Sequence, residues 1–406
     1  MQNRILEGKW LGTMLAVVLA GLLLFTACAP KALVKEEQVV EIGFMAGLTG
    51  PAAAASQYAF RTSVDYTKYF NEEGGIPGIT AKLTWADTAY KLDQAVSTYR
   101  RWTERGLPIF ILVLMEETTV LSPMAAKDEL PYITLAQSEG AMYPPGWVYS
   151  IYPTEAERFS VWCDWILENW QEDRPPRVAF MGADMAYGRE PEGQGTKYAE
   201  SIGIEMLPME FVPVLPLDVT TQLVRLNERG ADFVYITGIW STALPIMRDA
   251  ERLGLIGQIR FGGYENTQSR ALLEGLGPGA EGYVCPRVAP WVEQVEIPGI
   301  KLIRHLQMKY RGRLDVQGDE AHGFRAAYVA FEAVKRAVEE VGYENVDGAA
   351  VATALLSMKD FDPYGIGPIT YTADDHRGSN RVSVYQVKGG EVVRVADWRE
   401  APMLVP

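Results

Sequence analysis

The sequence predicts an α/β protein built from two doubly wound parallel-sheet lobes. Short apolar runs alternate with amphipathic segments from residue 39 to residue 261. Such alternation is typical of parallel strands that helices cover on both faces. It continues for longer than one sheet comfortably holds, so two lobes are expected. After Cys285 the pattern changes to two long helical segments, which predicts that the chain returns to cover the first lobe.

The first strand is expected in the apolar run VVEIGFM at 39–45, and the turn cluster GLTGP at 47–51 follows it. A helix over 56–73 ends at GGIPG (74–78), because glycine supplies a left-handed cap and proline cannot continue a helix. Asp218 is a good N-cap for a later helix. Further strands are predicted at 82–85, 109–114, 132–135, 177–181, 204–211, 233–237 and 258–261. Further helices are predicted at 91–106, 118–129, 155–170, 190–201, 219–229 and 242–253.

The C-terminal third predicts long helices followed by a hairpin. Helices are expected over 295–311 and 320–341, and the second carries an apolar stripe at helical spacing. Strands are expected at 368–371, 381–387 and 391–396. The last two are joined by KGG (388–390), which predicts a β-hairpin.

The N-terminus has the pattern of an export signal. An uncharged apolar run from 10 to 27 ends in LFTAC (24–28), which resembles a bacterial lipoprotein signal. We therefore expect a signal peptide over 1–27, a lipidated Cys28, and a polar tether over 28–38. The mature protein would be extracytoplasmic and anchored to a membrane by its lipid. An ordinary signal peptide with an incidental cysteine is the alternative.

Composition excludes several classes of protein. The chain has 406 residues, 48% of them hydrophobic and 22% charged, which is typical of a globular fold. Its net charge of −14 makes nucleic acid a poor partner. Three histidines and three cysteines favour neither a metal site nor a disulfide scaffold. Cys163 and Cys285 lie outside the reducing cytosol and could pair, although spacing alone does not show it.

The sequence offers little catalytic chemistry. It contains neither a phosphate-binding glycine loop nor a paired metal-ligand motif. The segment AQSEG (136–140) follows a predicted strand, so Ser138 could be a nucleophile with a later histidine, namely His305, His322 or His376. Serine is also common in such turns. His322 and His376 are read as structural or solvated. The pair Glu116-Glu117 suits either a pocket or a helix start.

Aromatic side chains gather near predicted strand ends and crossovers, where α/β sheets bind ligands. They could line a pocket or simply pack. They are Tyr143, Trp147, Tyr152, Tyr187, Trp240, Tyr264 and Trp291.

Several motifs in order resemble the branched-chain-amino-acid type of ABC-transporter substrate-binding protein. They are GLTGP (47–51), FNEEGGIPG (70–78), Asp87, AAY (326–328) and GPI (367–369). The resemblance implies a type I periplasmic-binding-protein-like fold with three crossovers, near 150–154, 285–289 and 367–372. It places 39–151 and 288–368 in lobe 1, and 152–287 and 369–406 in lobe 2.

The resemblance also implies a function. Such proteins are monomers that bind a small polar solute between the lobes, close by hinge bending and deliver the solute to a membrane permease. They are not enzymes and use no cofactor. Carried over to this chain, the binding residues are Thr49, Met115, Glu116, Ala136, Gln137 and Ser138 in the first lobe, and Tyr187, Trp240, Tyr264 and Glu265 in the second.

The acidic pair at 116–117 is a departure from that family. Amino-acid-binding members carry a small hydroxyl residue near this strand end, which holds the ligand carboxylate. An acidic pair would repel that carboxylate unless it is protonated or turned away. Ser138 remains a possible donor, and Glu265 could pair with an ammonium. Amino acids, amides, aromatic acids and cationic compounds therefore stay open as solutes.

Three alternatives to transport remain at this point. A ligand sensor of the same fold would feed a signalling partner instead of a permease. A secreted hydrolase would use Ser138. A purely structural surface lipoprotein would bind no solute at all.

Overall fold

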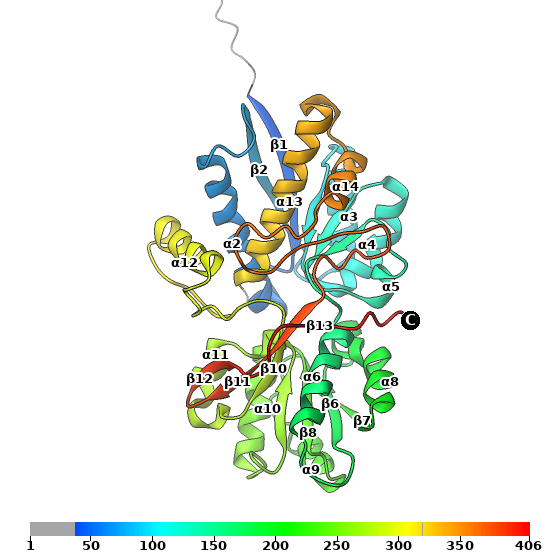
Figure 1. The fold of residues 1–406 in the computed structure, drawn as a ribbon, viewed down its shortest axis with the longest axis vertical. Helices are drawn as coiled ribbons and strands as arrows, with labels where there is room; N and C mark the ends of the chain where they lie inside the picture. Colours follow the sequence, from blue (N-terminus) through cyan, green and yellow to red (C-terminus); the bar gives the residue numbers. More distant parts are fainter. Residues whose placement is uncertain (1–36, 319) are drawn as a thin grey trace, which may run out of the picture. The chain divides into compact units, whose positions relative to one another are not determined.

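Two separate β-sheets organise the chain in the computed structural model, which describes residues 37–318 and 320–406 (Figure 1). Val39–Pro406 forms one unit. The expected signal peptide and Cys28 lie outside the described residues. By length and hydropathy, the described helices include no candidate membrane span.

The first sheet has the strand order β2-β1-β3-β4-β5, and its pairs β1-β3, β3-β4 and β4-β5 are parallel. The strands are β1 (Gln38–Ala46), β2 (Ile79–Asp87), β3 (Phe110–Leu112), β4 (Tyr132–Thr134) and β5 (Val148–Ser150). Every residue of β3, β4 and β5 is buried, as expected for strands of a parallel sheet that is covered on both faces. The helices that follow its strands are α2 (Ala53–Glu72), α3 (Leu92–Glu104), α4 (Met115–Asp128) and the short α5 (Glu139–Met142).

The second sheet has the order β12-β11-β10-β9-β8-β6-β7, with β13 paired to β11. Its parallel strands are β6 (Arg177–Gly182), β7 (Glu205–Phe211), β8 (Phe233–Thr237), β9 (Arg260–Gly263) and β10 (Val284–Arg287). Its antiparallel strands are β11 (Arg381–Lys388), β12 (Glu391–Arg394) and β13 (Arg399–Glu400). Its helices are α6 (Glu155–Asn169), α7 (Ala186–Arg189), α8 (Gln194–Ser201), α9 (Thr220–Glu228), α10 (Trp240–Arg252) and α11 (Arg270–Leu276). The expected C-terminal hairpin is confirmed in β11 and β12.

After β10 the chain returns to the first sheet, as the change to long helical segments after Cys285 predicts. It forms α12 (Pro298–Arg311), α13 (Glu320–Val341) and α14 (Gly348–Leu356), and α13 lies beside the blue α2 (Figure 1). The Ser63 hydroxyl of α2 donates to the Gly323 carbonyl of α13 at 3.0 Å. A side chain at Gly323 would collide with the Ala59 backbone, so glycine allows this close helix packing.

Some predicted elements have different bounds. The helix expected over 190–201 is split into a 3₁₀ turn (Glu190–Glu192) and α8, because Pro191 and Gly193 interrupt it. The strand expected at 368–371 is only an isolated bridge between Phe361 and Ile369. The strand expected at 258–261 begins later, at Arg260.

Two further details concern single residues. Asp218 accepts the Thr220 N–H at 2.8 Å, but it stands one residue before the N-cap, Val219. Cys163 and Cys285 are both free and buried, so the pairing that was left open is not formed.

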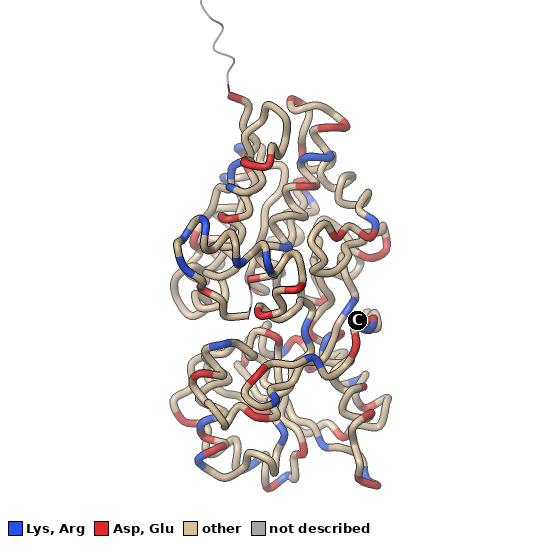
Figure 2. The backbone as a smooth tube through the Cα atoms, turned by 60° about the vertical axis from the view of Figure 1, so that its left-hand side comes forward, with Lys and Arg blue, Asp and Glu red and all other residues tan. Residues whose placement is uncertain are grey.

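Charged residues do not mark either sheet as a docking face for a polyanion. Lys and Arg interleave with Asp and Glu along the described backbone around both sheets (Figure 2).

Candidate functional site

A cavity of about 110 Å³ is lined by residues from the chain around both sheets. They come mainly from the segments that follow β1, β3, β6 and β8, that is, from the carboxyl ends of parallel strands. Ligands of open α/β sheets bind at such ends. His322 from the first turn of α13 also lines the cavity, as do Tyr152 and Glu155 from the segment after β5. The lining is largely apolar, with Ala52, Ala55, Leu114, Met185 and Ile239 among its side chains.

Two helix starts stand at this cavity. The segment after β3 leads into α4 at Met115, and the segment after β8 leads into α10 at Trp240. Met115 and Glu116 of α4, and Ile239 and Thr242 at α10, line the cavity. Because helix N-termini carry free N–H groups and partial positive charge, these ends favour polar or anionic groups.

Glu116 connects the two sides of the cavity. The Tyr90 hydroxyl donates to Glu116 Oε2 at 2.5 Å, and the Tyr187 N–H donates to Oε1 at 3.4 Å. Glu116 belongs to α4 beside the first sheet, whereas Tyr187 belongs to α7 beside the second. Burial and the Glu116 carboxylate raise the pKa of the Tyr90 hydroxyl well above its usual range, so Tyr90 remains a donor.

Glu155 is the second carboxylate of the cavity. It is the first residue of α6, whose N-terminus is fixed by a capping box between Thr154 and Glu157. Glu155 is only 2% exposed, and its Oε1 lies 2.6 Å from Arg158 Nη2. Its Oε2 is buried and has no hydrogen-bond partner among the described residues. Burial raises the pKa of the Glu155 carboxyl to about 7, although the Arg158 charge lowers it.

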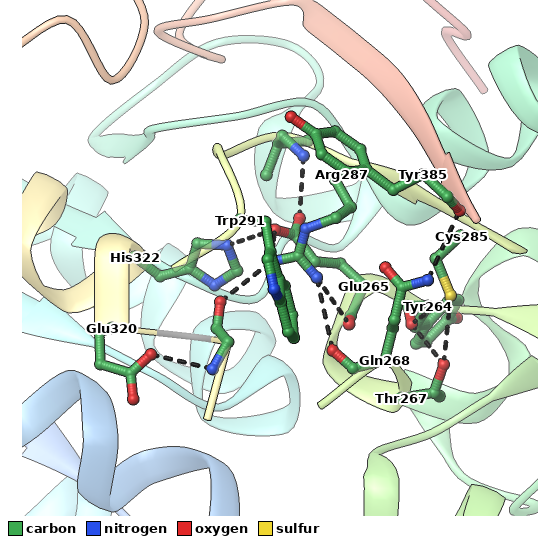
Figure 3. Close-up of polar contacts among 12 residues, drawn as sticks. Tyr264, Glu265, Thr267, Gln268, Cys285, Arg287, Trp291, Glu320, His322 and Tyr385 are labelled. Atoms are coloured by element: carbon green, nitrogen blue, oxygen red, sulfur yellow. Dashed lines mark hydrogen bonds and ion pairs between the residues drawn. The ribbon is translucent and has the colours of Figure 1, made fainter. Parts of the chain in front are cut away.

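A buried ionic cluster lies beside the cavity (Figure 3). Glu265 Oε1 is 2.9 Å from Arg287 Nη2 and 3.1 Å from His322 Nε2, and Glu265 Oε2 accepts the Val288 N–H at 2.9 Å. Burial raises the pKa of Glu265, but the charges of Arg287 and His322 outweigh it and lower the pKa to about 2. His322 lies on α13, which packs on the first sheet, and Glu265 follows β9 of the second sheet. This contact therefore links the two sheets through the segments attached to them.

The structure brings part of the predicted binding set to the cavity. Met115, Glu116, Ala136 and Tyr187 line it. Tyr264 supports Tyr187, because its hydroxyl donates to the Tyr187 carbonyl at 2.8 Å.

The other predicted residues lie outside the lining. Thr49 donates to Asp87 Oδ2 at 2.7 Å, and Gln137 is buried between Ser150 and Arg158. Trp240 is half-buried next to Ile239. Glu265 is engaged by its ion pair with Arg287.

Sequence reasoning did not assign Tyr90 and Glu155 to the site, and it read His322 as structural or solvated. Tyr90 stands in a left-handed turn after β2 (φ 62°), where only the unusual backbone distinguishes it. Glu155 has the sequence pattern of an ordinary helix start, where acids are common. The only sequence signal for Glu155 was its charge, directly after the crossover expected near 150–154.

The geometry gives the hydrolase alternative no support. Ser138 Oγ accepts the Thr119 hydroxyl at 3.0 Å. His322 Nε2 contacts Glu265 Oε1, and His376 Nδ1 contacts the Val148 carbonyl. Among the described residues, no cluster of His, Cys, Asp and Glu is arranged to hold a metal ion.

A family model described as periplasmic binding protein matches residues 39–391. The chain belongs to the periplasmic binding protein family. This family consists of non-catalytic substrate-binding proteins with two α/β lobes and parallel sheets, so the predictions of the fold class and of a non-enzyme are confirmed. The first sheet with its helices forms the first lobe, and the second sheet with its helices forms the second lobe.

Named relatives of this periplasmic binding protein share its length. A Leu/Ile/Val-binding protein homolog from Brucella melitensis is 24% identical over 363 residues, covering 87% of this chain and 93% of the relative. A branched-chain amino acid ABC-transporter protein from Thermus thermophilus, solved with bound valine, superposes with a TM-score of 0.84 at 23% identity, covering 90% of this chain and 97% of the other. A fatty acid ABC-transporter substrate-binding protein from Thermomonospora curvata gives a TM-score of 0.80 at 17% identity, covering 91% and 95%.

Proposed function

We propose that this periplasmic binding protein captures a small aliphatic solute, an amino acid or a close derivative, and delivers it to an ABC-transporter permease. The solute occupies the cavity between the lobes, and a lipidated Cys28 keeps the protein at the outer side of a membrane. The names of the Brucella relative and the Thermus structure support the transporter role and the aliphatic solute. The lipoprotein pattern at LFTAC supports the anchor.

The observation that carries this proposal is an apolar cavity lined by side chains of both lobes, with polar groups at a few points. Burying one leucine-sized side chain stabilises a complex by about 1.5–3 kcal/mol. The polar groups Glu116, Tyr187 and Glu155 would then set the orientation of the solute. A solute that touches both lobes stabilises the closed state over the open one, whereas a solute held by one lobe would not shift that equilibrium.

A thermal-shift screen tests the proposal. The panel contains L-leucine, L-valine, L-leucinamide, 3-methylbutylamine and 4-methylpentanoate. A compound present at 100 times its Kd adds about 2.7 kcal/mol of stability, which is readily measured. We expect at least one of these compounds to stabilise the protein. Failure of all of them would contradict the aliphatic solute.

A matched pair of variants locates the effect. Ala136→Leu adds volume to a cavity wall, so it should abolish stabilisation by the compound that binds. Ala349→Leu makes the same change at an exposed position on α14 and should leave that stabilisation intact. Equal stabilisation of both variants would place the solute elsewhere.

A further inference from the structure

The charged side chains that line the cavity have a strong bias in sign. Glu116 and Glu155 are carboxylates, and no Lys or Arg is among the described residues of the lining. His322 also reaches the cavity, but its Nε2 contacts Glu265. A bound anion would therefore meet two carboxylates without an ionic partner of its own.

We infer that the site selects a primary aliphatic amine whose carboxyl group is absent or neutralised, such as an amine or an amino-acid amide, and that Glu155 binds the ammonium group. This inference rests on the proposed function, since it names the class of solute for the same cavity.

The hydrogen bonding of Glu155 leaves a place for such a group. The side chain is 2% exposed and faces the cavity, and Arg158 contacts only Oε1. The buried Oε2 has no hydrogen-bond partner among the described residues. A buried carboxylate oxygen without a donor is costly, and an ammonium group supplies both the donor and the opposite charge.

Arg158 is also held by other contacts, although its buried Nε has no hydrogen-bond partner among the described residues. Its Nη2 also donates to Gln137 Oε1 at 3.2 Å, and its guanidinium lies 4.9 Å from the centre of the Tyr152 ring. Glu190 is a further carboxyl near Glu155, and both of its oxygens are buried without hydrogen-bond partners in the described chain. Burial, Glu155 and Glu139 raise the pKa of Glu190 well above its usual value, as expected where further negative charge is unfavourable.

The same arrangement disfavours a free amino acid. In an amino acid the carboxylate is attached to the carbon that carries the ammonium, so pairing the ammonium with Glu155 brings a second anion into this acidic surrounding. Ser138 was the candidate donor for that carboxylate, but it does not line the cavity. The helix starts of α4 and α10 are the remaining groups that could hold it, and the experiment below includes that outcome.

Calorimetric titration of the intact protein at pH 7 with four matched compounds tests the inference. L-leucine is a zwitterion, L-leucinamide and 3-methylbutylamine are cations, and 4-methylpentanoate is an anion, while all four share the same branched chain. We expect both cations to bind at least about tenfold more tightly than leucine, and the anion to show no binding. Leucine binding as tightly as the cations would overturn the inference and leave the proposed function standing. No binding of any compound would instead contradict the proposed function.

Glu155→Gln tests the assigned residue with the same compounds. It keeps the size of the side chain and removes its charge, so the preference for cations over leucine should fall by about tenfold or more. Glu117→Gln neutralises another buried carboxyl that does not line the cavity, and all affinities should stay within about twofold. An unchanged preference in Glu155→Gln would overturn the assignment. Should that variant not fold, the wild-type series still decides the solute class, and Glu155→Asp, which keeps the charge, should retain the preference.

Discussion

Burial determines the charge state of the carboxylate that we assign to the solute. Glu155 faces Arg158 of its own helix, Glu190 after α7, Glu265 after β9 and His322 of α13. Burial raises the pKa of Glu155 to about 7, so this side chain titrates near neutral pH in the absence of solute. A bound ammonium stabilises the ionised form and therefore releases a proton.

The affinity for 3-methylbutylamine should consequently rise with pH. Between pH 6 and pH 8 the ionised fraction of a carboxyl with a pKa of about 7 grows about tenfold, and the affinity should follow it. Titration at pH 6, 7 and 8 measures this. Because Glu155→Gln removes the titrating carboxyl, any pH dependence that remains in this variant comes from another group. A flat profile for the wild type would show that Glu155 does not titrate with binding.

Single residues also show where sequence reasoning ends. Glu116 was predicted as a binding residue and lines the cavity, because a strand end followed by a helix start is a local pattern. Glu265 was expected to be able to pair with an ammonium, but Arg287 and His322 already engage it. Nothing near residue 265 in the sequence shows which cation reaches it, since those partners come from β10 and α13.

At the scale of elements, the turn after β1 depends on the end of β2. Asp87 Oδ1 accepts the N–H groups of Leu48, Thr49 and Ala89, and its Oδ2 accepts the Thr49 hydroxyl. This holds the turn at 47–51, whose Pro51 lines the cavity. Burial opposes ionisation of Asp87, but these hydrogen bonds outweigh it and lower its pKa below the usual value.

Asp87→Asn should destabilise the protein by about 1–2 kcal/mol at pH 7, because hydrogen bonds to a charged acceptor are stronger than those to an amide. Since the folded-state pKa is lowered, the stabilisation is present above the unfolded pKa and is lost as pH falls through the folded pKa. Urea unfolding at pH 7 and at acidic pH measures the difference from wild type. Asp173→Asn, at an exposed loop position, should stay within about 0.5 kcal/mol. An equal loss of unfolding free energy in both variants would contradict the stabilising role of Asp87 in the turn at 47–51.

Elements whose signal is local were predictable. The alternation of apolar runs and amphipathic segments anticipated the strands and helices of both lobes, and KGG anticipated the final hairpin. The misplaced bounds have local causes, since Pro191 and Gly193 divide one predicted helix. The segment at 368–371 is apolar enough for a strand but pairs with Phe361 through a single bridge.

At the scale of the whole molecule, the site depends on chain segments that lie far apart in the sequence. Val113–Glu116 belongs to the first lobe, Thr237–Ile239 and Thr242 belong to the second, and all of these residues line one cavity. The contact of His322 with Glu265 joins α13 to the segment after β9. The two lobes were predictable because the alternation of strands and helices is longer than one sheet holds, whereas these contacts were not, because they depend on how the lobes meet.

The central claim is that one solute is held by both lobes together. Small-angle X-ray scattering, recorded without ligand and then at saturation with the tightest compound of the panel, tests it most directly. We expect the radius of gyration to decrease on saturation in the wild type and to remain unchanged in Ala136→Leu. Identical scattering curves for the free and the saturated wild type, with binding established by calorimetry on the same sample, would contradict the claim.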